Sequence, residues 1–136
     1  MISAIRHTGI VVRHLETILR FYESLGFQLW KRELEEGPFL ETIVGLKGAS
    51  VETAKLKSPC GALLELLCYH SHPMKEDIHP QLSNKLGCSH IAFTVDSIDT
   101  TLEFIHRQGG FLVNPPASNN TVRVAYCHDP EGNLLE

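Results

Sequence analysis

The sequence predicts an α+β fold in which two βαβββ modules pair into a half-open β-barrel with their helices outside. The first observation is an internal repeat that relates His7 to His90 at an offset of 83 residues (90 − 7). The second is a closing phrase that relates Glu65 to Glu136 at an offset of 71 (136 − 65). The third is the order of the hydrophobic patterns, because each copy reads as a strand, an amphipathic helix and further strands.

The first module is expected to occupy residues 1–69. Its expected strands cover residues 8–12, 27–32, 51–57 and 62–69, and the alternating pattern of 27–32 predicts a half-buried strand. A helix is expected over residues 15–25, because apolar side chains recur there at three- and four-residue steps. Gly26 stands where a left-handed helix cap is expected. Residues 33–48 are polar and are expected to form a loop with one helical turn near 39–44, an insertion that could supply a binding or lid element.

The second module is expected to occupy residues 88–136, after a linker over residues 70–87 with one short helix near 78–85. Its helix is expected over residues 98–108, with Asp96 or Ser97 as the N-cap. Its strands and final turn are expected at residues 89–95, 111–113, 122–127, 129–132 (the turn) and 133–136.

Length and composition favour a single globular domain of 136 residues, of which 43% are hydrophobic. The formal net charge of −4 gives no reason to expect nucleic acid or an anionic membrane as the main partner. No apolar run approaches the ~20 residues that span a bilayer. Residues 1–6 lack the regions of a signal peptide, so we expect a cytoplasmic protein.

The four cysteines are expected to be buried free thiols of a reducing compartment. They lie in or beside apolar stretches and contain no C-x-x-C spacing, which disfavours a zinc ribbon and a disulfide framework. They are Cys60, Cys68, Cys88 and Cys127.

Two histidines and two glutamates carry the chemistry that the repeat predicts. His7 and His90 begin equivalent first strands, and Glu65 and Glu136 stand on equivalent last strands. Glu65 lies in an otherwise apolar run, residues 62–68, where a carboxylate is costly unless it is paired or binds a cation. A lone histidine or glutamate in a strand is usually structural, but four in register favour one divalent-metal site with open positions for water or substrate.

The remaining histidines are expected to be structural or exposed. The spacing of two of them, His70 and His72, leaves adventitious zinc binding open as an alternative. The others are His14, His79, His106 and His128.

The duplicated pattern resembles the vicinal oxygen chelate superfamily, which includes glyoxalase I, methylmalonyl-CoA epimerase, extradiol dioxygenases, and the fosfomycin- and bleomycin-resistance proteins. The segments that carry the resemblance are residues 7–12, 15–26, 64–66, 87–95 and 129–133. The resemblance implies one divalent metal ion (Zn, Ni, Co, Mn or Fe) on four ligands, His7, Glu65, His90 and Glu136. It also implies a homodimer, since paired modules leave sheet edges that a second chain can cover.

With a glutamate at position 65, the ligand set resembles the four-ligand sites of two branches of that superfamily, glyoxalase I and the epimerases. It implies a metal-dependent lyase or isomerase that moves a proton next to a carbonyl through a metal-stabilised enediolate. By this resemblance the base is Glu136 or Glu65, with Glu136 favoured, and the substrate is a small molecule such as a thioester or hemithioacetal. The alternatives are a non-haem Fe(II) extradiol-type dioxygenase, which does not need Glu65, and a non-enzymatic drug-binding or resistance protein.

Five basic residues could anchor an anionic substrate, or else form a solvated surface. They are Arg13, Arg20, Lys31, Arg32 and Arg123.

Overall fold

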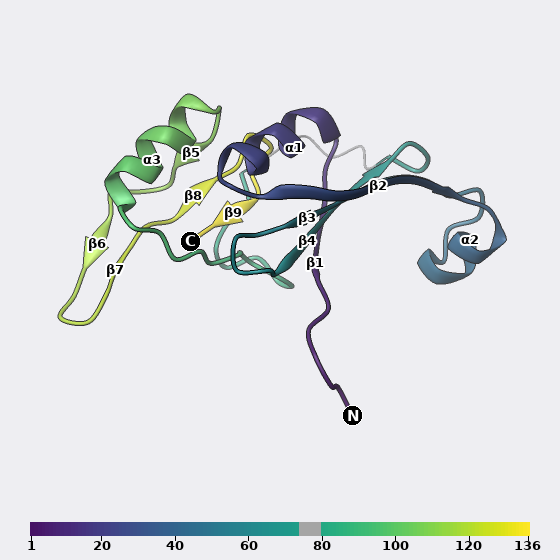
Figure 1. The fold of residues 1–136 in the computed structure, drawn as a ribbon, viewed down its shortest axis with the longest axis horizontal. Coiled ribbons are helices and arrows are strands. Elements are labelled where there is room, and N and C mark those ends of the chain that lie inside the picture. Colours follow the sequence, from purple (N-terminus) through teal and green to yellow (C-terminus); the bar gives the residue numbers. More distant parts are fainter. Residues whose placement is uncertain (74–79) are drawn as a thin grey trace. The chain divides into compact units, whose positions relative to one another are not determined.

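The computed structural model describes residues 1–73 and 80–136, which divide into two compact units, Met1–Glu76 and Asp77–Glu136. The boundary falls inside the segment predicted as a linker. The first unit has the predicted order of strand, helix and three strands, and the helical turn predicted near 39–44 is present as a short helix (Figure 1). Its elements are β1 (Thr8–Val11), α1 (Leu15–Ser24), β2 (Gln28–Glu36), α2 (Pro38–Val44), β3 (Ser50–Lys57) and β4 (Leu63–Tyr69).

The four strands of the first unit form one sheet in the order β1-β4-β3-β2. The first and last strands of the module therefore lie side by side, as predicted, and they run parallel with Gly9 opposite Glu65. β4 is antiparallel to β3, which is antiparallel to β2. Leu64 and Leu66 of β4 are buried, and because side chains alternate across a strand, Glu65 points to the opposite face of the sheet.

Helix α1 matches its prediction closely. Its apolar stripe is buried, and Phe21 joins that stripe in addition to the residues that the periodicity marks. The Phe21 and Tyr22 rings meet edge to face with centroids 5.2 Å apart, and Tyr22 meets Phe27 in the same way at 5.7 Å. Gly26 has φ of +97°, which confirms the predicted left-handed cap.

β2 is longer than predicted and is not half-buried. The prediction ended this strand at residue 32, but β2 continues to Glu36 and most of its side chains are exposed. The physical reason is its position at the edge of the sheet, where one side pairs with β3 along nearly its whole length and polar side chains remain in water. The predicted helical turn is confirmed as α2, whose Leu40 packs with Ala49 and Val51.

The second unit contains α3 (Ile98–Arg107) and short strands (Figure 1). Ser97 is the N-cap, because its hydroxyl accepts a hydrogen bond from the Thr100 amide. The paired strands here are shorter than predicted. The strand predicted over residues 122–127 is split into two, and its first part pairs with a strand at residues 117–118 that was not predicted. The strands are β5 (Phe111–Leu112), β6 (Ala117–Ser118), β7 (Arg123–Val124), β8 (Cys127–His128) and β9 (Leu134–Leu135).

The strand predicted over residues 89–95 is wrong as a continuous element. Only Ile91 forms a bridge, parallel to Leu135 of β9. The Ile91 amide donates to the Leu134 carbonyl and the Glu136 amide donates to the Ile91 carbonyl, and one further bond, from the Phe93 amide to the Glu136 carbonyl, extends the same pairing. A two-residue partner strand offers few backbone groups, so regular pairing stops there. The parallel pairing of Ile91 with Leu135 nevertheless corresponds to that of β1 with β4, where the equivalent residues Thr8 and Leu64 also pair in parallel.

The segment between the modules also differs from its prediction. Residues 78 and 79 lie outside the described residues, and residues 80–85 contain no helix; within them, the Lys85 amide donates to the Leu82 carbonyl and closes a turn over 82–85. Pro80 falls inside the predicted helix 78–85, and a proline inside a helix has no amide to donate and disfavours the helix. Within the described parts of the chain, no helix combines the length and the apolarity needed to cross a bilayer.

Candidate metal centre

His7 and Glu65 meet on one face of the first unit's sheet. His7 immediately precedes β1, and Glu65 lies in β4, the parallel neighbour of β1. The Nε2 atom of His7 lies 3.1 Å from Oε2 of Glu65, and the histidine side chain is 37% exposed while the glutamate side chain is 11% exposed. The buried carboxylate is therefore paired, as the cost of burying a charge requires.

Lys55 contacts the other oxygen of the same carboxylate. Its Nζ lies 3.2 Å from Oε1 of Glu65, and the strand register places the two residues opposite each other in β3 and β4. Glu65 is thus held by His7 on one oxygen and by Lys55 on the other.

His90 and Glu136 form the corresponding pair of the second unit. Nε2 of His90 lies 3.1 Å from Oε2 of Glu136, and both side chains are 31% exposed. Nδ1 of His90 is 2.8 Å from the Ser89 hydroxyl, a partner that fixes the orientation of the ring. The Tyr126 ring stands edge-on to His90 at 5.2 Å, and burial, then a hydrogen bond with Glu136, raises the pKa of the Tyr126 hydroxyl.

Both pairs fit a divalent first-row metal by their donor chemistry. Each supplies one imidazole nitrogen and one carboxylate oxygen, 3.1 Å apart in both units. Two donors that each lie about 2.1 Å from one ion, at ordinary coordination angles, are about 3.0–3.4 Å from each other. Among residues 1–73 and 80–136, no three His, Cys, Asp or Glu side chains form one metal-binding group, so the described geometry consists of the two pairs.

Lys55 and Tyr126 are the neighbours that the sequence-based prediction missed. The signal that could have found them is the repeat itself, because the offset of 71 that relates the two glutamates also relates these residues (126 − 55). Without the strand register, nothing marks Lys55 among the alternating residues of its strand as the one opposite Glu65.

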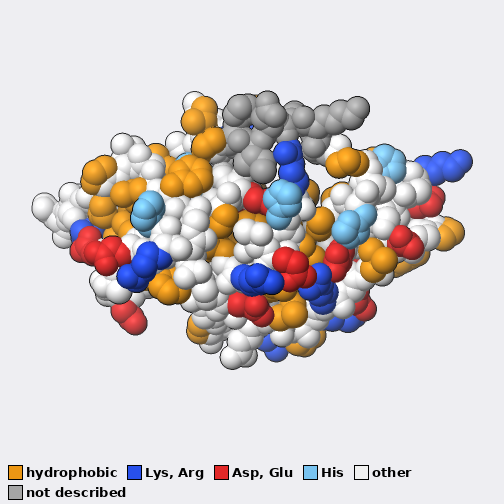
Figure 2. Space-filling view, turned by 90° about the horizontal axis from the view of Figure 1, so that it is seen from above, with side chains coloured by type: hydrophobic (Ala, Val, Ile, Leu, Met, Phe, Trp, Pro, Cys, Tyr) orange, Lys and Arg blue, Asp and Glu red, His pale blue; other side chains and the backbone are white. Residues whose placement is uncertain are grey.

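Three of the five basic residues considered as substrate anchors are engaged in ion pairs. Arg32 bonds Glu16 and Glu52, Lys31 bonds Glu33, and Arg123 forms a two-point bond with Asp99. Arg123 lowers the pKa of the Asp99 carboxyl through that hydrogen bond. These ion pairs favour the solvated-surface alternative for the three residues. In the face shown by Figure 2, several basic and acidic side chains lie beside one another.

The remaining histidines have mixed surroundings. Nε2 of His70 lies 3.0 Å from Oε2 of Glu52, so one of the two histidines considered for adventitious zinc binding is already paired. His128 is buried in β8, where its ring stacks on Phe111 with centroids 4.6 Å apart and its Nε2 lies 3.0 Å from the Gln81 carbonyl oxygen. It is thus a structural histidine of the second unit.

All four cysteines are free thiols, but the prediction that all are buried is wrong for two of them. Cys68 and Cys127 are buried, whereas Cys60 and Cys88 are exposed. The physical reason is local: Cys60 lies in the turn between β3 and β4, and Cys88 lies in the irregular segment before His90.

Alkylation should therefore distinguish the cysteines. We expect iodoacetamide at neutral pH to modify Cys60 first, because it is exposed and a hydrogen bond from Ser58 lowers the pKa of its thiol. We expect Cys127 to stay unmodified in the folded protein, because burial and the nearby Asp129 raise the pKa of its thiol to about 11. Peptide mass mapping over a time course measures both rates, and equal modification of the two would contradict this expectation.

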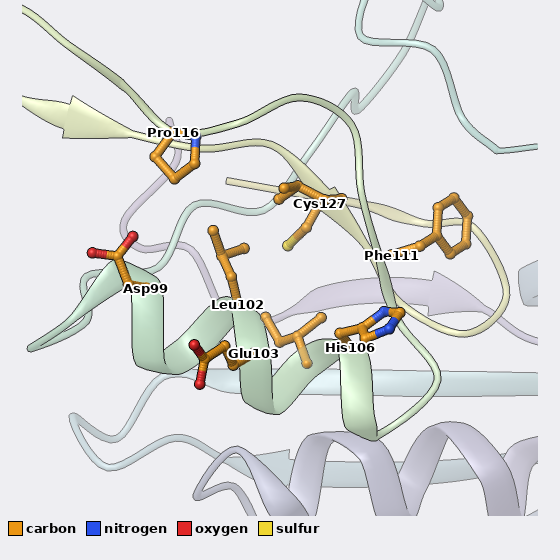
Figure 3. Close-up of a pocket in the computed structure, with 9 residues that line it drawn as sticks. Asp99, Leu102, Glu103, His106, Phe111, Pro116 and Cys127 are labelled. Carbon is orange, nitrogen blue, oxygen red and sulfur yellow. The ribbon is translucent and has the colours of Figure 1, made fainter.

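A separate pocket of about 410 Å³ lies between α3 and the strands of the second unit. Figure 3 shows Leu102 and His106 on the helix side, with Phe111 and Cys127 on the strand side. Its lining is mainly apolar and contains none of the four predicted ligands, so this pocket is distinct from the His90–Glu136 pair.

Comparisons with known proteins agree on one family. The model of the Glyoxalase/Bleomycin resistance protein/Dioxygenase superfamily matches residues 4–136. A probable lactoylglutathione lyase of Synechocystis is 31% identical over 96% of this chain and 90% of its own length. The lactoylglutathione lyase of Schizosaccharomyces pombe is 26% identical over 97% of this chain, which spans only 46% of that protein. The crystal structure of a glyoxalase family protein from Bacillus cereus has a TM-score of 0.90 at 28% identity, covering 99% of this chain and 92% of the other.

Proposed function

The chain belongs to the Glyoxalase/Bleomycin resistance protein/Dioxygenase superfamily and has its α+β fold, and on this basis we propose that it is a divalent-metal-dependent lyase or isomerase. One observation carries the proposal: at repeat-equivalent positions, each unit brings an imidazole Nε2 within 3.1 Å of a carboxylate Oε2. We propose His7, Glu65, His90 and Glu136 as the ligands of one ion of Zn, Ni, Co, Mn or Fe.

The proposed reaction moves a proton on the carbon next to a carbonyl group. A bound divalent ion would polarise that carbonyl. Glu136 is the proposed base, because its side chain is 31% exposed and can reach a substrate, whereas that of Glu65 is 11% exposed and is held on both oxygens.

The named relatives favour the lyase branch, and we propose a hemithioacetal or a thioester as the substrate. We also propose that the protein is a homodimer and acts in the cytoplasm. The presence of a carboxylate beside each histidine supports proton transfer over a purely drug-binding role, which needs neither carboxylate.

The decisive experiment measures exchange of the substrate α-proton with deuterium by NMR. The chain is stripped with a chelator, reloaded with each of the five metals, and incubated in D₂O with hemithioacetals and thioesters. Metal-dependent exchange of an α-proton supports the proposal. Oxygen consumption with catechols and Fe(II), without such exchange, would favour the dioxygenase alternative, and failure to bind any of the metals would reject the metal-dependent proposal.

A further inference from the structure

The residues opposite the two glutamates occupy equivalent places in the two units. In the first unit, Lys55 of β3 pairs with Glu65 of β4. In the second, Cys127 pairs with Leu135, so the same antiparallel register places Tyr126 opposite Glu136. The offset of 71 residues relates both members of one pair to both members of the other. The repeat therefore includes a cross-strand neighbour for each glutamate.

Lys55 and His7 contact different oxygens of the Glu65 carboxylate. The lysine ammonium lies 3.2 Å from Oε1, and the imidazole lies 3.1 Å from Oε2. The lysine side chain is only 26% exposed, so this contact is partly shielded from water. One oxygen of this carboxylate therefore faces the histidine, and the other is bound by the lysine ammonium.

Tyr126 takes the corresponding place in the second unit. Its ring lies edge-on to His90 with ring centroids 5.2 Å apart, and the register places it opposite Glu136, whose Oε2 faces His90. One side chain thus neighbours both members of the pair. A tyrosine hydroxyl can donate to a carboxylate as the lysine ammonium does, but without a charge.

We propose that Lys55 and Tyr126 are positioning residues, each holding the glutamate opposite it so that one carboxylate oxygen faces the neighbouring histidine. This inference rests on the proposed function, because it assigns the histidine-facing oxygen as the donor to the ion. Partners that orient a ligand are part of a metal site, and their loss typically weakens metal binding about 10- to 100-fold. The alternative is that both residues only stabilise the sheet.

Cobalt binding separates these roles, since the visible absorption of Co²⁺ reports the number and geometry of its donors. The variants are Lys55→Met, Lys55→Arg and Tyr126→Phe, with Lys57→Met as the control. Lys57 lies on the same strand but pairs with Leu63, and its ammonium lies 5.4 Å from the Trp30 ring centroid. Circular dichroism and thermal unfolding of the metal-free proteins report the folded state.

Lys55→Met is expected to change the Co²⁺ spectrum, because the freed Oε1 can also bind the ion, while Lys55→Arg and Lys57→Met keep the wild-type spectrum. Tyr126→Phe, which removes one oxygen atom and no charge, is expected to weaken Co²⁺ binding about tenfold. Folded Lys55→Met and Tyr126→Phe proteins with wild-type spectra and affinities would overturn this inference alone. If Lys55→Met does not fold, the near-isosteric Tyr126→Phe decides. A wild-type protein that binds no cobalt would instead reject the proposed function, and the inference with it.

Discussion

Replacing Glu65 by alanine is expected to abolish both metal binding and turnover. The side chain supplies one of four proposed donors, and its carboxylate is held 3.1 Å from His7 and 3.2 Å from Lys55. Because even the loss of an outer partner costs about 10- to 100-fold in metal affinity, the loss of a donor should weaken binding by more than about 100-fold. Metal content after gel filtration and the α-proton exchange rate measure the two effects.

The same loss is expected for His90→Ala, although His90 belongs to the other unit. If one ion requires donors from both units, either substitution removes the same ion, and the wild-type protein binds one equivalent per ligand set. Two independent sites would give a different result, in which each variant loses half of the bound metal. That outcome would contradict the four-ligand proposal and leave one His–Glu pair per site.

Two exposed residues of α3 provide matched controls for these losses. Glu103→Ala and His106→Ala remove the same chemical groups from a helix that carries none of the proposed ligands. Both controls should retain full metal content. Glu65→Ala protein that keeps its metal and consumes oxygen with a catechol would favour the dioxygenase reading, in which Glu65 is dispensable.

Glutamine at the same positions separates a ligand from a base. An amide oxygen still coordinates a metal but cannot take up a proton at neutral pH. We expect Glu65→Gln to retain bound metal and measurable exchange, and Glu136→Gln to retain metal while exchange falls by at least about 100-fold. The reverse pattern would transfer the role of base to Glu65.

Much of the fold follows from local patterns in the sequence. The periodicity of residues 15–25 fixes α1 and its buried stripe, and the repeat fixes which histidine and glutamate belong together. The failures have physical causes. Glu33, Glu35 and Glu36 suggest a loop, yet they lie in β2 because an edge strand keeps its side chains in water while its backbone pairs.

The partners of the glutamates needed more than pattern. Alternation shows that Lys55 and Lys57 share a face of β3, but only the register shows that Lys55 is the one opposite Glu65. That register is set by the turn between β3 and β4, where Ser58 and Gly61 are hydrogen-bonded through their backbones. For a site assembled from several strands, the sequence thus predicts which types of residue take part. Which residues lie next to one another requires the strand register.

Asp129→Ala is expected to have the largest effect on stability. Asp129 is fully buried in the turn between β8 and β9. Its Oδ1 accepts hydrogen bonds from the amides of Glu131 and Asn133, and its Oδ2 accepts one from the Asn133 side chain. Truncation leaves these part-buried donors without their acceptor, so the free energy of unfolding should fall by about 3 kcal/mol. Urea unfolding followed by circular dichroism measures the change.

Asn133→Ala provides the graded comparison, because it removes only the 2.8 Å side-chain bond and keeps both backbone amides paired. Its cost should be about 1 kcal/mol. The turn also sets the register in which Cys127 pairs with Leu135, and this register carries Glu136 to its place opposite Tyr126. Asp129→Ala should therefore weaken Co²⁺ binding as well as the fold, and more than Asn133→Ala does. Equal cobalt affinity in both variants and the wild type would show that the carboxylate of Glu136 is positioned independently of this turn.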